Sequence, residues 1–328
     1  SWGCAVNTDF WAYAMMLPFG PWEPDVSGVN ARDQAGRVTM EIARNVYPTR
    51  EGWGPMPSLA DYSTGTALPT TAKGLFAART TAGGWVIFAG TTTKLYKFNS
   101  GTSTFDDYTR VAGGAYSVPS TDFWSFTQFG SKVIAVNLND DPQVIDIDTG
   151  ASAFTALGGT PPKARYVAVV GDFVFLANLS TNSRMVQNSA INDSAGWTVG
   201  PNLSDTQEFA DGDSVTGISG GEFGWITQEH AIRRAIFQPG FDQAFRFERV
   251  ERERGAVGAY NVVGVRDTIF FRAADGFYMF GPGGLRPIGH QRIDDWFNAN
   301  SDKTRHISMI GFSDQTGPRA CWGFYNNT

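Results

Sequence analysis

Short runs of apolar residues recur along most of the chain at intervals of roughly 40 to 50 residues. Each run holds four or five residues, is rich in apolar and aromatic side chains, and is followed by a polar turn. The runs are Trp85-Val86-Ile87-Phe88, Lys132-Val133-Ile134-Ala135-Val136, Phe173-Val174-Phe175-Leu176, Phe223-Gly224-Trp225-Ile226, Thr268-Ile269-Phe270-Phe271 and Ala320-Cys321-Trp322-Gly323. The pattern predicts six short β-strands that are equivalent parts of one repeated unit.

Second strands follow several of these runs at hairpin spacing. Residues 95–98, 144–147 and 277–280 each come after a turn, and the last follows Asp275-Gly276, a strong hairpin signal. Repeats of this length are typical of β-propeller blades, which hold four strands each and need neighbouring blades to cover their faces. We therefore expect an all-β fold, a β-propeller of about five or six blades. A β-sandwich with long irregular hairpins is the alternative.

Residues 1–63 fall outside the repeat and are predicted to form an extended N-terminal arm, with the propeller over 64–328. Residues 17–63 are rich in Pro and carry Trp22 and Trp53, which favours an extended, turn-rich path. Helical periodicity is weak at 32–44 and clearer at 291–299. The chain has no initiator Met and ends on a strand-like run, so we expect a fragment with an incomplete last blade at the C-terminus.

Composition narrows the class of protein. Only 18% of the 328 residues are charged and 42% are hydrophobic, so a large core can form. The formal net charge of −6 argues against a nucleic-acid-binding surface. Apolar stretches are too short for a membrane helix, and the first residues make a poor signal peptide. Cys4 and Cys321 are too few for a disulfide framework, and their pairing with each other is left open.

Sequence motifs for catalysis are absent, so we expect no enzyme, no catalytic residue and no cofactor. Gly281-Pro282-Gly283-Gly284 links two strands and is interpreted as a turn. The run from Asn137 to Asp148 resembles a calcium loop, but Pro142 stands where the loop needs Gly, which favours a hairpin turn. Asp211-Gly212-Asp213-Ser214 is read as a turn, with a surface cation site as the alternative. No metal site is predicted, and the three His residues are taken as structural.

The run Arg246 to Arg254 reads RFERVERER, and as a strand it would carry charge on both faces. We interpret it as a solvated edge strand, with a polar contact to another subunit as the alternative. The residues expected at subunit interfaces are Trp22, Trp53, Arg252 and Arg254.

Three stretches together resemble a group of tailed-bacteriophage virion proteins with a β-propeller body. The first stretch is the LPFGPWEPD run at 17–25 together with 43–48 and 54–59. The second is RMVQNSAIND at 184–193, followed by Trp197. The third consists of 275–280, 287–289 and 293–297. The resemblance covers most of residues 17–310 through the order and spacing of these stretches. Residues 1–15 have no counterpart in it.

The resemblance implies a structural virion protein at the head–tail junction or in the tail, of the hub, nozzle or stopper kind. It implies a ring, expected to hold about six copies, around the DNA path. The partners would be other copies and neighbouring virion proteins such as portal, adaptor or tail components. DNA would pass nearby without specific binding, because an acidic surface repels phosphate. We expect no membrane partner, and location in the virion after assembly in the bacterial cytoplasm.

Two other functions remain open. A carbohydrate-binding or carbohydrate-active propeller, such as a receptor-binding component, is suggested by Trp85, Trp124, Trp197 and Trp225, which could stack on sugars. Exposed tryptophans in a groove would favour this function, and buried ones would favour a scaffold. A capsid decoration protein is the other alternative, and it would differ only in where it binds.

Overall fold

The computed structural model describes residues 21–26, 38–49, 52–55, 65, 67–241, 243–258, 260–265, 267–314 and 319–327. By their mutual contacts the residues group into two units, one made of 1–59 with 291–296 and the other of 60–290 with 297–328. The predicted boundary at residue 63 lies close to the first division, but the segment 291–296 was not expected to join the arm.

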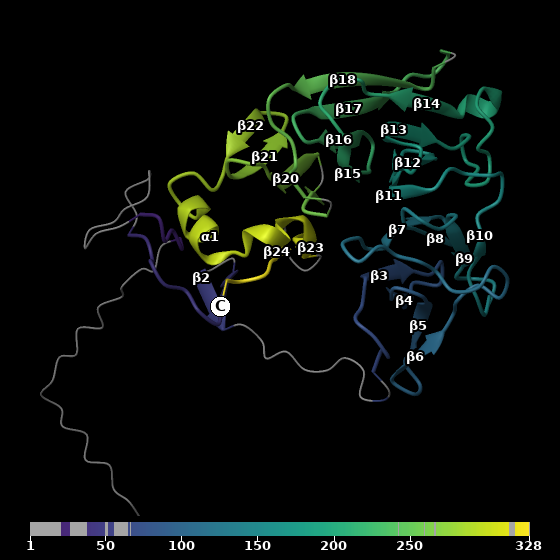
Figure 1. Cartoon of the computed structure of the whole chain (residues 1–328), viewed down its shortest axis with the longest axis horizontal. Coiled ribbons are helices and arrows are strands. Elements are labelled where there is room, and N and C mark those ends of the chain that lie inside the picture. Colours follow the sequence, from purple (N-terminus) through teal and green to yellow (C-terminus); the bar gives the residue numbers. More distant parts are fainter. Residues whose placement is uncertain are drawn as a thin grey trace, which may run out of the picture. The chain divides into compact units, whose positions relative to one another are not determined.

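The second unit is an all-β propeller (Figure 1). Five antiparallel sheets have four strands each, and in every sheet the strands follow chain order. The first three sheets contain β3 (Gly74–Arg79), β4 (Trp85–Gly90), β5 (Leu95–Asn99) and β6 (Thr104–Asp107); β7 (Ser125–Phe129), β8 (Lys132–Val136), β9 (Gln143–Asp146) and β10 (Thr155–Ala156); and β11 (Ala164–Val170), β12 (Phe173–Leu179), β13 (Asn182–Asn188) and β14 (Asp205–Glu208).

The remaining sheets continue the same meander. They contain β15 (Val215–Ser219), β16 (Gly224–Gln228), β17 (Ile232–Phe237) and β18 (Phe245–Glu251); β19 (Val263–Val265), β20 (Thr268–Arg272), β21 (Phe277–Gly281) and β22 (Gly284–Pro287); and the pair β23 (Ile310–Asp314) and β24 (Arg319–Gly323). Short 3₁₀ helices cover Pro201–Leu203 and Lys303–Ser308. The predicted propeller is confirmed, and the β-sandwich alternative is wrong.

The first strand of each sheet lies on the inside of the ring. β7 packs against β3 and β11, β11 against β15, and β19 against β23. Single parallel bridges also join neighbouring sheets, from Val170 to Gly221 and from Tyr260 to Ile310. These contacts place the six inner strands around one central channel, as in a propeller.

The six apolar runs in the sequence correspond to the second strand of each sheet, β4, β8, β12, β16, β20 and β24. In the five four-stranded sheets, the second strand lies between two partner strands. β8, β12 and β16 are the most deeply buried of these strands, and all seven residues of β12 are buried. β4 is buried over half of its length, and the described residues of β24 are only half-buried or exposed. The sequence periodicity therefore marks the same position in each sheet, whatever the depth of burial there.

Aromatic side chains fill the spaces between neighbouring sheets. Phe173 and Phe175 of the third sheet pack edge-on against Phe245 of the fourth, with ring centroids 4.9 and 4.8 Å apart. Between the first and second sheets, Trp124 meets Tyr116 edge-on at 4.9 Å. Edge-to-face pairs of this kind add stability beyond the apolar area that they bury.

In the first unit, the described residues form a two-stranded hairpin, β1 (Val46–Thr49) and β2 (Gly52–Pro55), and an isolated bridge from Trp22 to Met40. The helix expected at 32–44 is wrong over 38–44, the part described, because Met40 takes part in that bridge. The helix expected at 291–299 is confirmed as α1 (Asp294–Asn300). None of the described helices has the length and apolar character needed to span a membrane.

Candidate functional site

A central cavity of about 290 Å³ lies where the inner strands converge. Each of the six sheets contributes to its wall, mostly through apolar side chains. The lining residues are Leu75, Phe76, Trp124, Ser125, Phe126, Tyr166, Val167, Gly217, Ile218, Tyr260, Val262, Ile310 and Gly311. The cavity is therefore the channel of the propeller, and it is narrow because side chains fill most of it.

A hydrogen-bonded group of polar side chains, which we call the polar tie, includes Tyr260 of the channel wall and lies beside the starts of the inner strands. Tyr260, just before β19, donates its hydroxyl proton to Asp122 Oδ1 at 2.5 Å, although 138 positions separate the two residues. Arg165, at the start of β11, donates from Nε to Asp122 Oδ2 at 3.1 Å. Asp122 is only 2% exposed, and the Phe123 amide also donates to its Oδ1 at 3.1 Å, so three donors hold the buried carboxylate. The second, third and fifth sheets are thus joined at one point.

Burial raises the pKa values of the tyrosines at the polar tie. Burial raises the pKa of Tyr260 well above its ordinary value, and the neighbouring Asp122 charge raises it further. Burial also raises the pKa of Tyr166, whose ring lies 5.6 Å from the Tyr260 ring. Both phenols therefore stay protonated at neutral pH, and the Tyr260 hydroxyl remains a donor to Asp122.

Lys73, directly before β3, contacts the loop that carries Asp122. Its ammonium group donates to the carbonyl oxygens of Pro119, Ser120 and Asp122, at 3.3 Å for Pro119 and 3.2 Å for Asp122. The group also lies 5.4 Å from the centre of the Phe123 ring. Lys73 thus fixes the loop that presents Asp122, and its three donor hydrogens all have acceptors.

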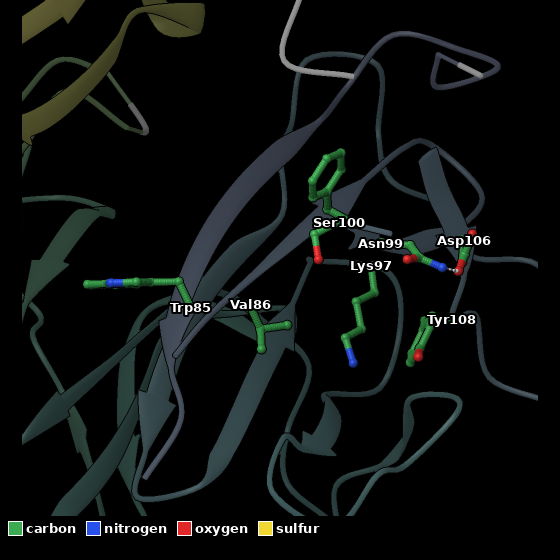
Figure 2. Close-up of a pocket in the computed structure, with 8 residues that line it drawn as sticks. Trp85, Val86, Lys97, Asn99, Ser100, Asp106 and Tyr108 are labelled. Atoms are coloured by element: carbon green, nitrogen blue, oxygen red, sulfur yellow. Dashed lines mark hydrogen bonds between the residues drawn. The ribbon is translucent and has the colours of Figure 1, made fainter. Parts of the chain in front are cut away.

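A second cavity, of about 330 Å³, opens on the outer part of the first sheet. Figure 2 shows Lys97, Asn99, Asp106 and Tyr108 around it, from β5, β6 and the residues that follow β6. The Lys97 ammonium group lies 5.1 Å from the centre of the Tyr108 ring. Asn99 donates from Nδ2 to Asp106 Oδ2 at 2.9 Å. We call this cavity the outer cleft.

The four tryptophans considered for sugar stacking differ in exposure. Trp124, Trp197 and Trp225 are 4 to 6% exposed and belong to the core. Trp85 is 65% exposed and is one of the residues that line the outer cleft, although its ring is directed away from Lys97 and Tyr108 in Figure 2. By the criterion of exposure in a groove, the three buried tryptophans behave as scaffold residues, whereas Trp85 meets the criterion for sugar binding.

The predicted interface residues do not form one cluster. Trp22 packs edge-on against Trp296 with ring centroids 5.0 Å apart, and its Nε1 donates to the Glu41 carbonyl at 3.1 Å. Trp53 lies in β2 and is half-buried. The role of these two residues in a subunit interface stays a prediction.

Arg252 and Arg254 follow β18, the outermost strand of the fourth sheet, which confirms the predicted edge strand. Arg252 is exposed. Arg254 donates from Nε to Asp275 at 2.8 Å, and this hydrogen bond together with the Asp275 charge raises the pKa of Arg254. Arg254 therefore has a partner within its own chain, whereas the Arg252 side chain faces solvent.

Two polar loops were considered as cation sites from the sequence. In the loop from β8 to β9, Asn137 Oδ1 accepts from the amides of Asn139 and Asp140, and Asp140 pairs with Arg110 at 3.0 Å, as in a hairpin turn. The exposed side chains of Asp213, Glu229 and His230 lie within 4.8 Å of one another and could hold a cation. Asp211 instead binds Arg233 and Arg249. Cys321 lies in β24, and Cys4 is outside the described residues.

No protein-family model matches the chain, and no curated protein matches it. Among solved structures, the extracellular domain of a one component system from Bacteroides thetaiotaomicron is 9% identical, with a TM-score of 0.46 over 67% of this chain and 30% of that one. The extracellular domain of a hybrid two component system from the same organism is 10% identical, with a TM-score of 0.44, over 67% and 28% of the two chains.

An auxiliary nutrient binding protein from Bacteroides thetaiotaomicron is 11% identical, with a TM-score of 0.41, over 65% of this chain and 56% of that one. The chain thus spans between 28% and 56% of the length of these structures.

Proposed function

We propose that the protein is a structural component of a tailed-bacteriophage virion, at the head–tail junction or in the tail. It would assemble with other copies of itself and with neighbouring virion proteins such as portal, adaptor or tail components, around a path along which DNA passes without specific binding. Support from the sequence is the resemblance carried by 17–59, 184–197 and 275–297. On this proposal the protein is not an enzyme and acts by forming contacts.

The observation that carries the proposal is that buried polar side chains join separate sheets and loops of the propeller. Asp122 joins three sheets through Tyr260 and Arg165, and Asp140 joins two loops through Arg110. Buried charges paired in this way specify one arrangement of elements rather than adding much net stability. A rigid propeller held by such ties suits a part that must keep its shape within an assembly.

The first test is the mass of the purified protein by multi-angle light scattering. A closed ring of about six chains would have roughly six times the chain mass of 35.7 kDa. Within that ring, Arg252→Glu is expected to weaken assembly because the exposed arginine follows an edge strand. Arg286→Glu, an equal charge change on the exposed outer strand β22, is the matched control.

Labelling of virus particles with an antibody against the chain then tests the location. Label at the head–tail junction or the tail supports the proposal. Label spread over the capsid surface would instead support the decoration alternative, and absence of the chain from particles would overturn both.

A further inference from the structure

The outer cleft brings donors and acceptors together on one face of the first sheet. Lys97 and Asp106 are direct cross-strand partners in the β5–β6 pairing, and Val86 and Asn99 also line the cleft. Opposite charges side by side make the cleft close to neutral, so it neither attracts nor repels a charged ligand strongly. Within the described part of the chain, the Lys97 ammonium group has no hydrogen-bond acceptor and no ion-pair partner.

The side chains of the cleft are held in place by neighbours. Asp106 Oδ1 accepts from the Thr104 hydroxyl at 3.1 Å, and Asp106 Oδ2 accepts from Asn99. Asn99 Oδ1 in turn accepts from the Gly101 amide at 3.0 Å. Each carboxylate oxygen keeps a free lone pair, because an ionised carboxylate accepts about four hydrogen bonds. Such support from a second layer of contacts lowers the entropic cost of binding a ligand.

An apolar wall completes the cleft. Val86 and the ring of Tyr108 line it beside the polar groups, and the Tyr108 hydroxyl makes no hydrogen bond within the described residues. A sugar ring presents hydroxyl groups that both donate and accept, together with C–H faces that pack on apolar surface. The volume of about 330 Å³ is at the lower end for ligand pockets, which fits a short segment rather than a long chain.

We propose that the outer cleft binds a neutral, hydroxyl-rich sugar unit. Asp106 accepts from sugar hydroxyl groups, Lys97 and the Tyr108 hydroxyl donate to sugar oxygens, and Val86 and the Tyr108 ring pack against a C–H face. Trp85 also lines the cleft, but its ring is directed away from these polar groups in Figure 2. This inference goes beyond the structural role proposed above and does not depend on it.

The test is binding of the full chain to an array of immobilised oligosaccharides. The array holds neutral glycans built from glucose, galactose, mannose and N-acetylhexosamines, beside sulfated and sialylated glycans of the same backbones. We expect binding to at least one neutral glycan, which is then titrated in solution by isothermal calorimetry. No neutral glycan bound, or binding confined to charged glycans, would overturn the proposal.

Three variants connect the binding to the cleft. Asp106→Ala is expected to weaken it by about tenfold or more, because a hydrogen bond to a charged group is lost. Asp106→Asn keeps the shape of the β5–β6 hairpin, and Lys97→Met keeps the contact with the Tyr108 ring. If Asp106→Ala does not fold, these two variants test the cleft in its place. Each should weaken binding several-fold.

Lys94→Met is the matched control for Lys97→Met, since Lys94 lies directly before β5, pairs with Asp107 at 2.6 Å and is not among the residues that line the cleft. It should leave the affinity unchanged. Equal affinity in all variants, or a loss caused by Lys94→Met alone, would place the sugar elsewhere and refute the outer cleft. The particle-labelling experiment tests the virion role separately, so failure of either proposal is recognised by itself.

Discussion

At the level of single residues, the hydroxyl group of Tyr260 holds distant parts of the propeller together. It donates to Asp122 and also accepts from the Phe123 amide at 3.1 Å. The phenol ring packs edge-on against Phe123 at 5.0 Å, so the apolar contacts would survive the loss of the hydroxyl. Removal of the hydroxyl alone therefore tests the hydrogen bond between Tyr260 and Asp122.

We predict that Tyr260→Phe lowers the free energy of unfolding by about 1.5–3 kcal/mol, because it deprives a buried carboxylate of a hydrogen bond. Urea unfolding followed by circular dichroism measures the change. Tyr108→Phe is the control, since the Tyr108 hydroxyl has no partner among the described residues, and its effect should stay within about 0.5 kcal/mol. A change of equal size in the two variants would argue against the tie.

Gly90 offers a second test at this scale. A Cβ atom at this position would lie 2.2 Å from Cδ1 of Trp124, whose ring fills the space between the first two sheets. We predict that Gly90→Ala destabilises the protein by about 1–3 kcal/mol through overpacking. Thermal unfolding gives the measurement, and Gly323→Ala, where a Cβ meets no atom within 4 Å, serves as the reference. A neutral Gly90→Ala would mean that Trp124 moves at little cost.

Among the elements, α1 shows how a short helix gains a cap from distant sequence. The Asp25 carboxylate accepts from the amides of Asp295 and Trp296 at 2.9 and 2.7 Å, and these amides lack partners inside the helix. Glu23 adds an ion pair with Arg292 at 3.2 Å. The Pro- and Trp-rich segment at 21–25 is thus tied to residues 292–296, rather than free as an extended arm would be.

We predict that Asp25→Ala costs about 1 kcal/mol of stability through loss of this cap. Hydrogen exchange of the amides of residues 295 and 296 should become faster, while exchange in β12 stays slow. Asp25→Asn retains a side-chain acceptor and should recover part of the loss. Unchanged exchange at both amides in Asp25→Ala would contradict the cap.

The clearest strand signals in the sequence come from strands that are buried along most of their length. Second strands such as β8 and β12 are buried along nearly their whole length, so they form continuous apolar runs. The inner strand β7 and the outer strand β6 have mixed surroundings, and their sequences show no such run. The weak helical pattern at 32–44 misled over 38–44, the part described, where Met40 forms an isolated bridge instead of belonging to a helix.

The candidate sites were harder to predict for a different reason. Asp122 and Tyr260 meet only because the ring brings the second and fifth sheets to one channel, and a sequence without known contacts does not show this. Asp106 and Lys97 lie in a hairpin and could have been paired by register. Of the tryptophans predicted to stack on sugars, Trp124, Trp197 and Trp225 are buried, because large aromatic rings fill the space between blades.

Across the whole molecule, buried tyrosines couple stability to alkaline pH. Burial raises the pKa of Tyr116 to about 12, and burial raises the pKa of Tyr166 and Tyr260 as well. In the unfolded chain these phenols ionise near pH 10. Between pH 10 and the folded pKa values, the native state therefore holds protons that the unfolded state has lost.

The sign follows from this difference in bound protons. The stabilisation is complete below pH 10 and is lost as pH rises through the folded pKa values, at up to about 1.4 kcal/mol per pH unit for each tyrosine. We predict that the free energy of unfolding falls steeply above pH 10, measured by urea unfolding from pH 8 to 11. Tyr116→Phe removes one of these phenols, so its curve should fall less steeply than that of the parent chain over the same range. Parallel curves would mean that the Tyr116 phenol ionises equally in both states, although it donates to Gln143 at 3.1 Å from a position that is 2% exposed.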